Sequence, residues 1–419
     1  MRTRETGAAR GLAAPVAVTS TRNLIGLVCF LIAMIDGYDT LMMSFIAPLI
    51  LSEWHLPPAS FGKIFASTYA GAALGATVIG TYADRFGRRS MLLVSLMLAG
   101  VFTILSATAR NPTQLMLWRM IAGIGLGGVI PTIAALTAAH ARPERRSVAV
   151  TRMFLGFPVG AMLGGAVTAA AMFWIGWRGI LVAVGVCALL VLFLVKFVIA
   201  EEAQDSPESP RPVHSRRPFA ELLQDGRFWG TTFLCSATLM TLLVSYFLVS
   251  WTPTVLTLNG ASPQRAALAS TLLNVGGVVG AWVVSSIARG RALLHCIAGY
   301  LCVGALLIAT LGRGGLGTSL LSLLLLFAVG MLIIGAQLNF PALSVYFYPP
   351  SVSATGVGLS MAIGRVGSIL GPLIGGYLAA AHVGWDTMFL IASIPALVAG
   401  LATALMGKSR AQGASQTTI

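Results

Sequence analysis

The chain consists mainly of long apolar stretches separated by short polar segments. A stretch of about 20 residues can cross about 30 Å of hydrocarbon as a helix. The stretches show no strict alternation of the kind found in membrane barrel strands. The pattern therefore predicts an all-α polytopic membrane protein with twelve transmembrane helices, at roughly 23–47, 60–82, 90–108, 113–137, 147–171, 176–199, 228–250, 264–288, 291–312, 316–347, 352–379 and 385–406.

Composition and charge agree with this prediction. The sequence is 57% hydrophobic and only 10% charged, whereas a soluble protein carries roughly a quarter charged residues. The net charge is +14, but most Lys and Arg lie in the segments predicted to share one side with both termini, which is the positive-inside bias. We therefore expect both termini to be cytoplasmic and no nucleic-acid partner. The five cysteines lie in predicted spans without paired spacing, so no metal, cofactor or redox role is expected.

A polar segment rich in Pro, Ser and charge divides the predicted helices into two sets of six. We predict a cytoplasmic tail, a first six-helix bundle, a cytoplasmic linker, a second six-helix bundle and a second tail, over residues 1–22, 23–199, 200–227, 228–406 and 407–419.

The two halves resemble each other at an offset of about 207 residues. Gly123 and Gly128 in the fourth predicted helix match Gly330 and Gly335 in the tenth. Glycines at matched positions let helices approach closely, so the fourth and fifth predicted helices should pack in the same way as the tenth and eleventh. Six helices per repeat preserve the orientation, as in transporters whose halves are related by an axis along the membrane normal. This predicts pseudo-symmetric bundles with a substrate site between them.

The loop after the second predicted helix reads GTYADRFGRR at residues 80–89. This fits the pattern G-x-x-x-D-R-x-G-R-R and resembles the major facilitator superfamily (MFS), where such a loop latches the inward gate. The arginines could also anchor to anionic headgroups. The loop at 285–294 in the second half has no acid, which disfavours two symmetric latches. The resemblance implies gating roles for Gly80, Asp84, Arg85, Gly87, Arg88 and Arg89.

Four formal charges lie deep in predicted helices, namely Asp36, Asp39, Arg119 and Arg365. Each would cost about 2.5–3.5 kcal/mol if it faced lipid. The two aspartates are three residues apart and should share one helical face. Two carboxylates in a low-dielectric site are costly to ionise together, so one of them could exchange a proton near neutral pH. A purely structural network of ion pairs is the open alternative.

Further segments resemble one branch of that superfamily over most of the chain, from about residue 25 to 400. The most discriminating is DGYD at 36–39, followed by RMIAGIGLGGVIPTIAALT at 119–137 and ATGVGLSMAIGRVGSILGPLIGG at 354–376. They resemble the aromatic acid:proton symporters of the 4-hydroxybenzoate and benzoate type. The resemblance implies uptake of benzoate-like carboxylates with protons across a bacterial inner membrane by a monomer.

Carried over by position, this resemblance makes Asp36 and Asp39 the proton-coupling residues and Arg365 a ligand for the substrate carboxylate. Arg119 is a second candidate, because a guanidinium presents two parallel donors to a carboxylate. The remaining candidates for substrate binding are Tyr38, Trp251, Gln337 and Asn339, with Phe157, Tyr246 and Phe340 as further aromatic walls. Hydrogen bonding between helices is the competing interpretation for the amides, and it is preferred for Asn274.

Three alternative functions stay open. The chain could be a proton-driven efflux antiporter, although the GAMLGG sequence at 160–165 lacks the proline that such antiporters carry in the fifth helix. It could transport another organic anion. A membrane sensor or enzyme is the least favoured, because the predicted helices contain no Ser/His/Asp or His-rich constellation. We therefore expect no enzymatic activity.

Overall fold

The computed structural model describes residues 13–142, 146–198, 222, 227–288, 290–314, 317, 319–349 and 352–416. The regular elements of these residues are all α-helices. They are α1 (Ala13–Trp54), α2 (Ala59–Phe86), α3 (Arg88–Ser106), α4 (Pro112–His140), α5 (Arg146–Phe154), α6 (Gly156–Val198), α8 (Phe228–Leu258), α9 (Pro263–Ile287), α10 (Arg291–Gly314), α11 (Leu320–Phe347), α12 (Ser353–Ala380) and α13 (Trp385–Gln416).

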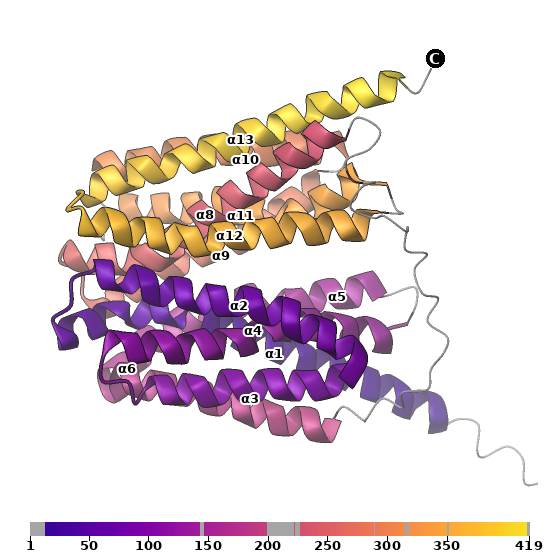
Figure 1. The fold of residues 1–419 in the computed structure, drawn as a ribbon, viewed down its shortest axis with the longest axis horizontal. Helices are drawn as coiled ribbons and strands as arrows, with labels where there is room; N and C mark the ends of the chain where they lie inside the picture. Colours follow the sequence, from indigo (N-terminus) through magenta and orange to yellow (C-terminus); the bar gives the residue numbers. More distant parts are fainter. Residues whose placement is uncertain are drawn as a thin grey trace, which may run out of the picture.

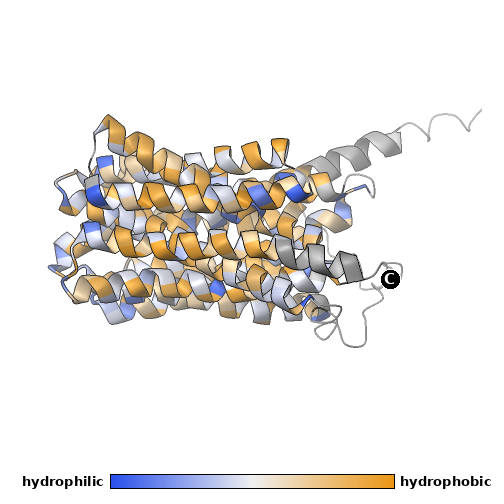
Figure 2. Ribbon diagram, turned by 90° about the horizontal axis from the view of Figure 1, so that it is seen from above, coloured by the Kyte–Doolittle hydropathy of each residue, from blue (hydrophilic) through white to orange (hydrophobic). Residues whose placement is uncertain are grey.

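Within the described residues, 11 helices are long and apolar enough to cross a membrane. The longest candidate, Val148–Val198, has 51 residues. Its backbone leaves the helical region at Gly176, where φ is 62°, so this candidate forms two spans rather than one. The predicted all-α fold with twelve spans is thereby confirmed. The helices are apolar along most of their length and polar toward their ends (Figure 2).

The helices form two bundles, α1–α6 and α8–α13, which lie side by side (Figure 1). The terminal helices α1 and α13 extend into the segments predicted as tails, beginning at Ala13 and ending at Gln416. The linker at 200–227 lies almost entirely outside the described residues, and the boundaries of the five predicted segments stay predictions.

Matched glycines hold matched helix pairs together in the two bundles. A Cβ atom on Gly123 of α4 would lie 2.3 Å from the carbonyl oxygen of Thr68 in α2. A Cβ atom on Gly330 of α11 would lie 1.9 Å from the carbonyl oxygen of Leu273 in α9. Only glycine permits such close approach of two backbones. The fourth and tenth predicted helices, which are α4 and α11, therefore pack in the same way, as expected.

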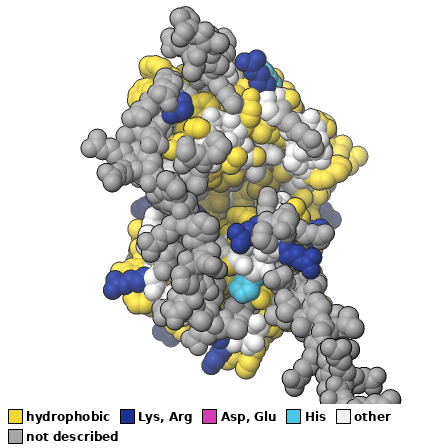
Figure 3. Space-filling model, turned by 90° about the vertical axis from the view of Figure 1, so that its right-hand side faces the viewer, with side chains coloured by type: hydrophobic (Ala, Val, Ile, Leu, Met, Phe, Trp, Pro, Cys, Tyr) yellow, Lys and Arg dark blue, Asp and Glu magenta, His cyan; other side chains and the backbone are white. Residues whose placement is uncertain are grey.

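The two bundles approach each other closely at one end of the described structure, which we call the closed face, where α1 ends and α2 begins. There a Cβ atom on Gly62 of α2 would lie 2.8 Å from the Cα atom of Gly376 in α12. The rings of Phe65 and Trp251 are 6.0 Å apart, and α2 contacts α8 through them. The opposite end, where α1 begins and α13 ends, is the open face, and it is hollowed between the bundles (Figure 3).

We predict that Gly62→Leu opens the closed face, because the new side chain has no space against the α12 backbone. Spin labels at the exposed positions Arg110 and Arg265, one on each bundle, should then move apart by at least the width of the added side chain. Electron–electron resonance distances in a background without native cysteines measure this. Gly26→Leu is the matched control, since nothing lies within 4 Å of a Cβ atom there. An unchanged distance in Gly62→Leu would show that the contact between Gly62 and Gly376 does not hold the closed face together.

Candidate functional site

Asp39 and Arg119 form an ion pair inside the first bundle. Nη1 of Arg119 donates to Oδ1 of Asp39 at 2.9 Å, and both side chains are almost completely buried. The hydroxyl of Thr103 donates to Oδ2 of the same carboxylate at 2.8 Å. Nη1 of Arg119 also reaches this hydroxyl, at 3.1 Å. The charges of α1 and α4 thus neutralise each other, with α3 completing the network.

Asp36 lies in a different environment from Asp39. Its side chain is only 5% exposed, and Oδ1 has no hydrogen-bond partner within the described residues. Its electrostatic partners are Asp39 and, across the seam between the bundles, Arg365 of α12. Side chains three residues apart on a helix point in directions that differ by about 60°. Asp39 can therefore reach α3 and α4 while Asp36 interacts with α12. The sequence predicted one shared face and could not separate the two partners.

Arg365 is the cation on the second bundle's side of this seam. It is half-buried, and its guanidinium makes neither a hydrogen bond nor a close ion pair with any described residue. Arg365 and Asp36 both interact electrostatically with Tyr246 of α8. The structure therefore brings together Asp36, Arg365 and Tyr246, and it places Arg119 elsewhere, in the pair with Asp39.

The two residues between the aspartates fasten α1 to α6. A Cβ atom on Gly37 would lie 2.1 Å from the carbonyl oxygen of Phe157, so glycine is required for this close approach. The hydroxyl of Tyr38 hydrogen-bonds to that of Thr168 at 2.8 Å. Tyr38, a predicted substrate-binding residue, thus contacts α6 and does not line the pocket described next.

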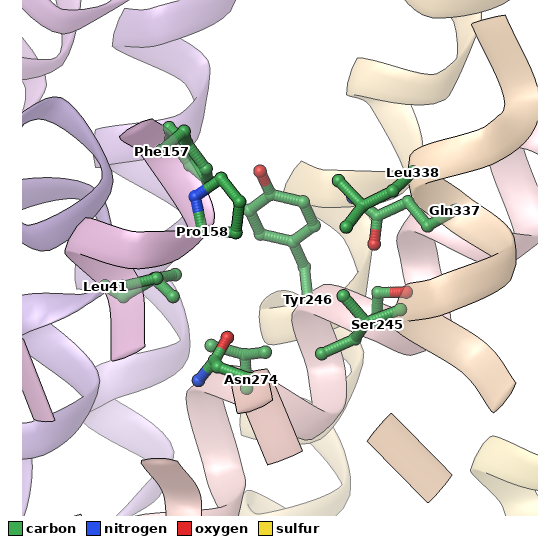
Figure 4. Close-up of a pocket in the computed structure, with 11 residues that line it drawn as sticks. Leu41, Phe157, Pro158, Ser245, Tyr246, Asn274, Gln337 and Leu338 are labelled. Carbon is green, nitrogen blue, oxygen red and sulfur yellow. The ribbon is translucent and has the colours of Figure 1, made fainter. Parts of the chain in front are cut away.

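A pocket lies between the two bundles, and Tyr246 is one of its lining residues (Figure 4). The first bundle contributes Leu41, Phe157, Pro158 and Ala161, and the second bundle contributes Ser245, Tyr246, Val249, Asn274, Ile334, Gln337 and Leu338. The ring of Tyr246 extends into the space between Pro158 and Leu338 (Figure 4). Tyr246 therefore connects the pocket with Asp36 and Arg365.

Three residues predicted from the sequence line this pocket, namely Gln337, Phe157 and Tyr246. Trp251 does not. It is fully buried, its indole N–H donates to the carbonyl of Pro372 at 3.2 Å, and its ring belongs to the contact at the closed face. Trp251 is therefore placed to hold the bundles together rather than to touch a ligand in the pocket.

Asn339 and Phe340 also lie away from the pocket. The amide of Asn339 donates to the carbonyl of Gly335 at 2.9 Å and to that of Ala281 at 3.4 Å. The second bond joins α11 to α9, which is the helix–helix interpretation that the sequence left open. Asn274, for which that interpretation was preferred, bonds within α9 to the carbonyl of Ser270 at 3.2 Å and also lines the pocket. Ser245 was missed, because its helix contains many Ser and Thr residues.

The arginines of the predicted gating loop bond to neighbouring helices of the first bundle. Gly87 separates α2 from α3 with φ at 87°, a left-handed conformation that favours glycine. Arg88 donates to the carbonyl of Ala135 in α4 at 3.5 Å, and Arg89 donates to that of Lys196 in α6 at 2.8 Å. The loop thus ties the ends of three helices together at the open face.

The other predicted gating residues have simpler surroundings. Arg85 is exposed, with its guanidinium 5.4 Å from the ring centre of Phe86. Nothing lies within 4 Å of a Cβ atom added to Gly80. The side chain of Asp84 is outside what the structure describes. No group of His, Cys, Asp and Glu that could hold a metal ion occurs among the described residues.

Comparison with known proteins identifies the family. The profile of the Major Facilitator Superfamily matches residues 29–372. The chain is 34% identical to a gallate transporter of Pseudomonas putida, over 94% of each chain. It is 32% identical to the 4-hydroxybenzoate transporter PcaK of Pseudomonas aeruginosa, over 91% of this chain and 92% of that one.

A solved structure shares the fold. A bacterial homologue of the human lysosomal transporter Spinster, in an inward-facing and occupied conformation, matches with a TM-score of 0.76 and 16% identity. The match covers 94% of this chain and 98% of that one. With the match of the family profile, the chain belongs to the Major Facilitator Superfamily, whose members are membrane transporters and not enzymes.

Proposed function

We propose that this chain imports a small aromatic carboxylate together with protons across a bacterial inner membrane. The relatives named for gallate and 4-hydroxybenzoate support the substrate class. The observation that carries the coupling is Asp36, a buried carboxylate with an unpartnered oxygen that interacts with Arg365 across the seam between the bundles. Both termini are cytoplasmic in this proposal, so the open face is the cytoplasmic face.

The charges explain how proton and substrate depend on each other. When Asp36 carries a proton it is neutral, and the guanidinium of Arg365 is available to the carboxylate of the substrate. When Asp36 is ionised it competes with the substrate for Arg365, since two anions share one cation. Protonation thus favours substrate binding and deprotonation favours release.

The rest of the pocket suits a flat aromatic ring. Phe157, Pro158 and Leu41 form an apolar wall, and binding sites for small molecules combine such walls with few polar groups. Tyr246 can pack against the ring while its position links the pocket to the charged group. The substrate would therefore lie across the seam, with its carboxylate toward Arg365.

In this proposal, alternating access would proceed by making and breaking the contacts between the bundles. In the described conformation the recess lies at the open face (Figure 3), from which substrate and proton would leave to the cytoplasm. The reverse motion would separate Gly62 from Gly376 and open the other face. Arg88 and Arg89 would then act as the gate, by holding the ends of α3, α4 and α6 as one unit that moves against the second bundle.

The ion pair between Asp39 and Arg119 bears on which aspartate carries the proton and which arginine binds the substrate. Each of these two side chains already neutralises the charge of the other inside the first bundle. This supports Asp36 rather than Asp39 as the proton carrier. It likewise supports Arg365 rather than Arg119 as the ligand of the substrate carboxylate.

Proteoliposomes test this proposal. Radiolabelled para-hydroxybenzoate should accumulate when the outside is more acidic than the lumen, and an uncoupler should abolish the accumulation. Accumulation under the opposite gradient would identify an efflux antiporter instead. Transport of aliphatic but not aromatic carboxylates would move the substrate class to other organic anions.

Arg365→Lys should lower the affinity for an aromatic carboxylate roughly tenfold or more, because lysine keeps the charge but loses the paired donors. Binding to the purified protein in detergent, followed by scintillation proximity, measures the dissociation constant. Arg110→Lys is the matched control, since Arg110 is exposed between α3 and α4. Equal affinity of Arg365→Lys and the wild type would remove Arg365 from the site.

A further inference from the structure

The two walls of the pocket differ in chemistry. The wall from the first bundle consists of the apolar side chains of Leu41, Phe157, Pro158 and Ala161. Besides Tyr246, the wall from the second bundle contains three uncharged polar side chains, each from a different helix: Ser245 of α8, Asn274 of α9 and Gln337 of α11. Figure 4 shows these three around the same space. One edge of a bound molecule would therefore meet hydrogen-bonding groups, and its faces would meet apolar ones.

Of these three side chains, Ser245 gives the strongest indication of a ligand. It is only 2% exposed, and its oxygen has no hydrogen-bond partner in the part of the chain that the structure describes. Some hydroxyls of the same helix bond to the carbonyl one turn back, as Thr241 does to Ala237 at 2.7 Å. Those of Ser250 and Thr254 are unpartnered among the described residues as well, but of the three only Ser245 lines the pocket. A buried polar group without a partner is costly, and such groups are rare unless a ligand or water completes them.

The side-chain amides of Asn274 and Gln337 also have hydrogen-bonding groups that no described residue uses. Asn274 uses its N–H group for the carbonyl of Ser270, which leaves its side-chain oxygen as an acceptor. The amide of Gln337 makes no hydrogen bond to any described residue, so it offers both donor and acceptor. A hydroxyl is itself both donor and acceptor and fits such a mixed set. A second carboxylate fits less well, because none of the three side chains is charged.

We propose that Ser245, Asn274 and Gln337 form a subsite for a ring hydroxyl of the substrate, at its meta or para position. This inference rests on the proposed function. Arg365 would hold the carboxylate at one end, and Tyr246, which interacts with Arg365 and also lines the pocket, lies between the two ends. An ortho hydroxyl would remain beside the carboxylate, at the Arg365 end, and would not reach the subsite.

Uptake by wild-type proteoliposomes tests the position of the hydroxyl. Half-saturation constants are compared for benzoate and for ortho-, meta- and para-hydroxybenzoate under one proton gradient. We expect the meta or para isomer to be preferred roughly tenfold over benzoate and over the ortho isomer, since a site built to bond a hydroxyl rejects analogues that lack it. Equal constants for all four compounds would overturn the subsite alone. Uptake of none would overturn the proposed function and the subsite together.

Ser245→Ala tests the residue. The preference for the para or meta isomer over benzoate should fall roughly twofold to tenfold, as expected for one hydrogen bond. Ser44→Ala is the control, because Ser44 is 0% exposed, has an equally unpartnered hydroxyl and does not line the pocket. A preference that persists in Ser245→Ala, or falls equally in Ser44→Ala, would overturn the role of Ser245. The panel of isomers decides the proposal if Ser245→Ala does not fold.

Discussion

Asp36→Asn is expected to abolish gradient-driven accumulation of substrate while leaving substrate exchange intact. An asparagine resembles the protonated carboxyl in shape and charge, so Arg365 stays available to the substrate carboxylate, but the side chain can no longer release a proton. Net uptake into proteoliposomes under an inward proton gradient should reach only the equilibrium level. Counterflow, in which labelled substrate outside exchanges for unlabelled substrate inside, should continue.

The control for this variant is Asp386→Asn, which removes an exposed carboxylate at the start of α13 on the closed face. It should accumulate substrate as the wild type does. Full accumulation by Asp36→Asn would show that another group carries the proton. Loss of counterflow together with accumulation would mean that Asp36 is needed for binding itself.

The second large effect concerns the ion pair between Asp39 and Arg119. Removing one partner, as in Asp39→Asn or Arg119→Met, leaves a buried charge without compensation and should lower the free energy of unfolding by about 3–5 kcal/mol. Removing both together should cost less than either single change, because no unpaired charge remains. Unfolding of the purified proteins in detergent, followed by circular dichroism against denaturant, gives the three values.

The double variant also separates structure from transport. If the pair is structural, the double variant should still accumulate substrate per folded molecule, whereas Asp36→Asn should not. Single variants as stable as the wild type would contradict the structural role. If the double variant is stable but no longer couples substrate uptake to the proton gradient, Asp39 would again be a candidate proton carrier.

Much of the fold follows from the sequence, because helix length and apolar runs are local properties. The matched glycines, including Gly123 and Gly330, also predicted close helix approach, and both lie against the backbone of a neighbouring helix. The two separate helices that the sequence predicted around Gly176 are also present. They meet at that residue, where the backbone leaves the helical region.

The site could be predicted only in part, since partners depend on contacts far apart in the chain. The four membrane charges were found, but a count of charges cannot say that Asp39 pairs with Arg119 while Asp36 interacts with Arg365. Ser245 carried no distinguishing signal. Its importance appears only in the structure, where it is the one unpartnered hydroxyl among the described residues of α8 that lines the pocket.

The most direct test of the central claim is proton movement caused by substrate. Proteoliposomes with a pH-sensitive dye in the lumen, and with no initial gradient, receive para-hydroxybenzoate from outside, and empty liposomes correct for passive entry of the acid. The account predicts rapid acidification of the lumen with the wild type and none above background with Asp36→Asn. Equal acidification by both proteins, or none by the wild type while substrate still enters, would contradict it.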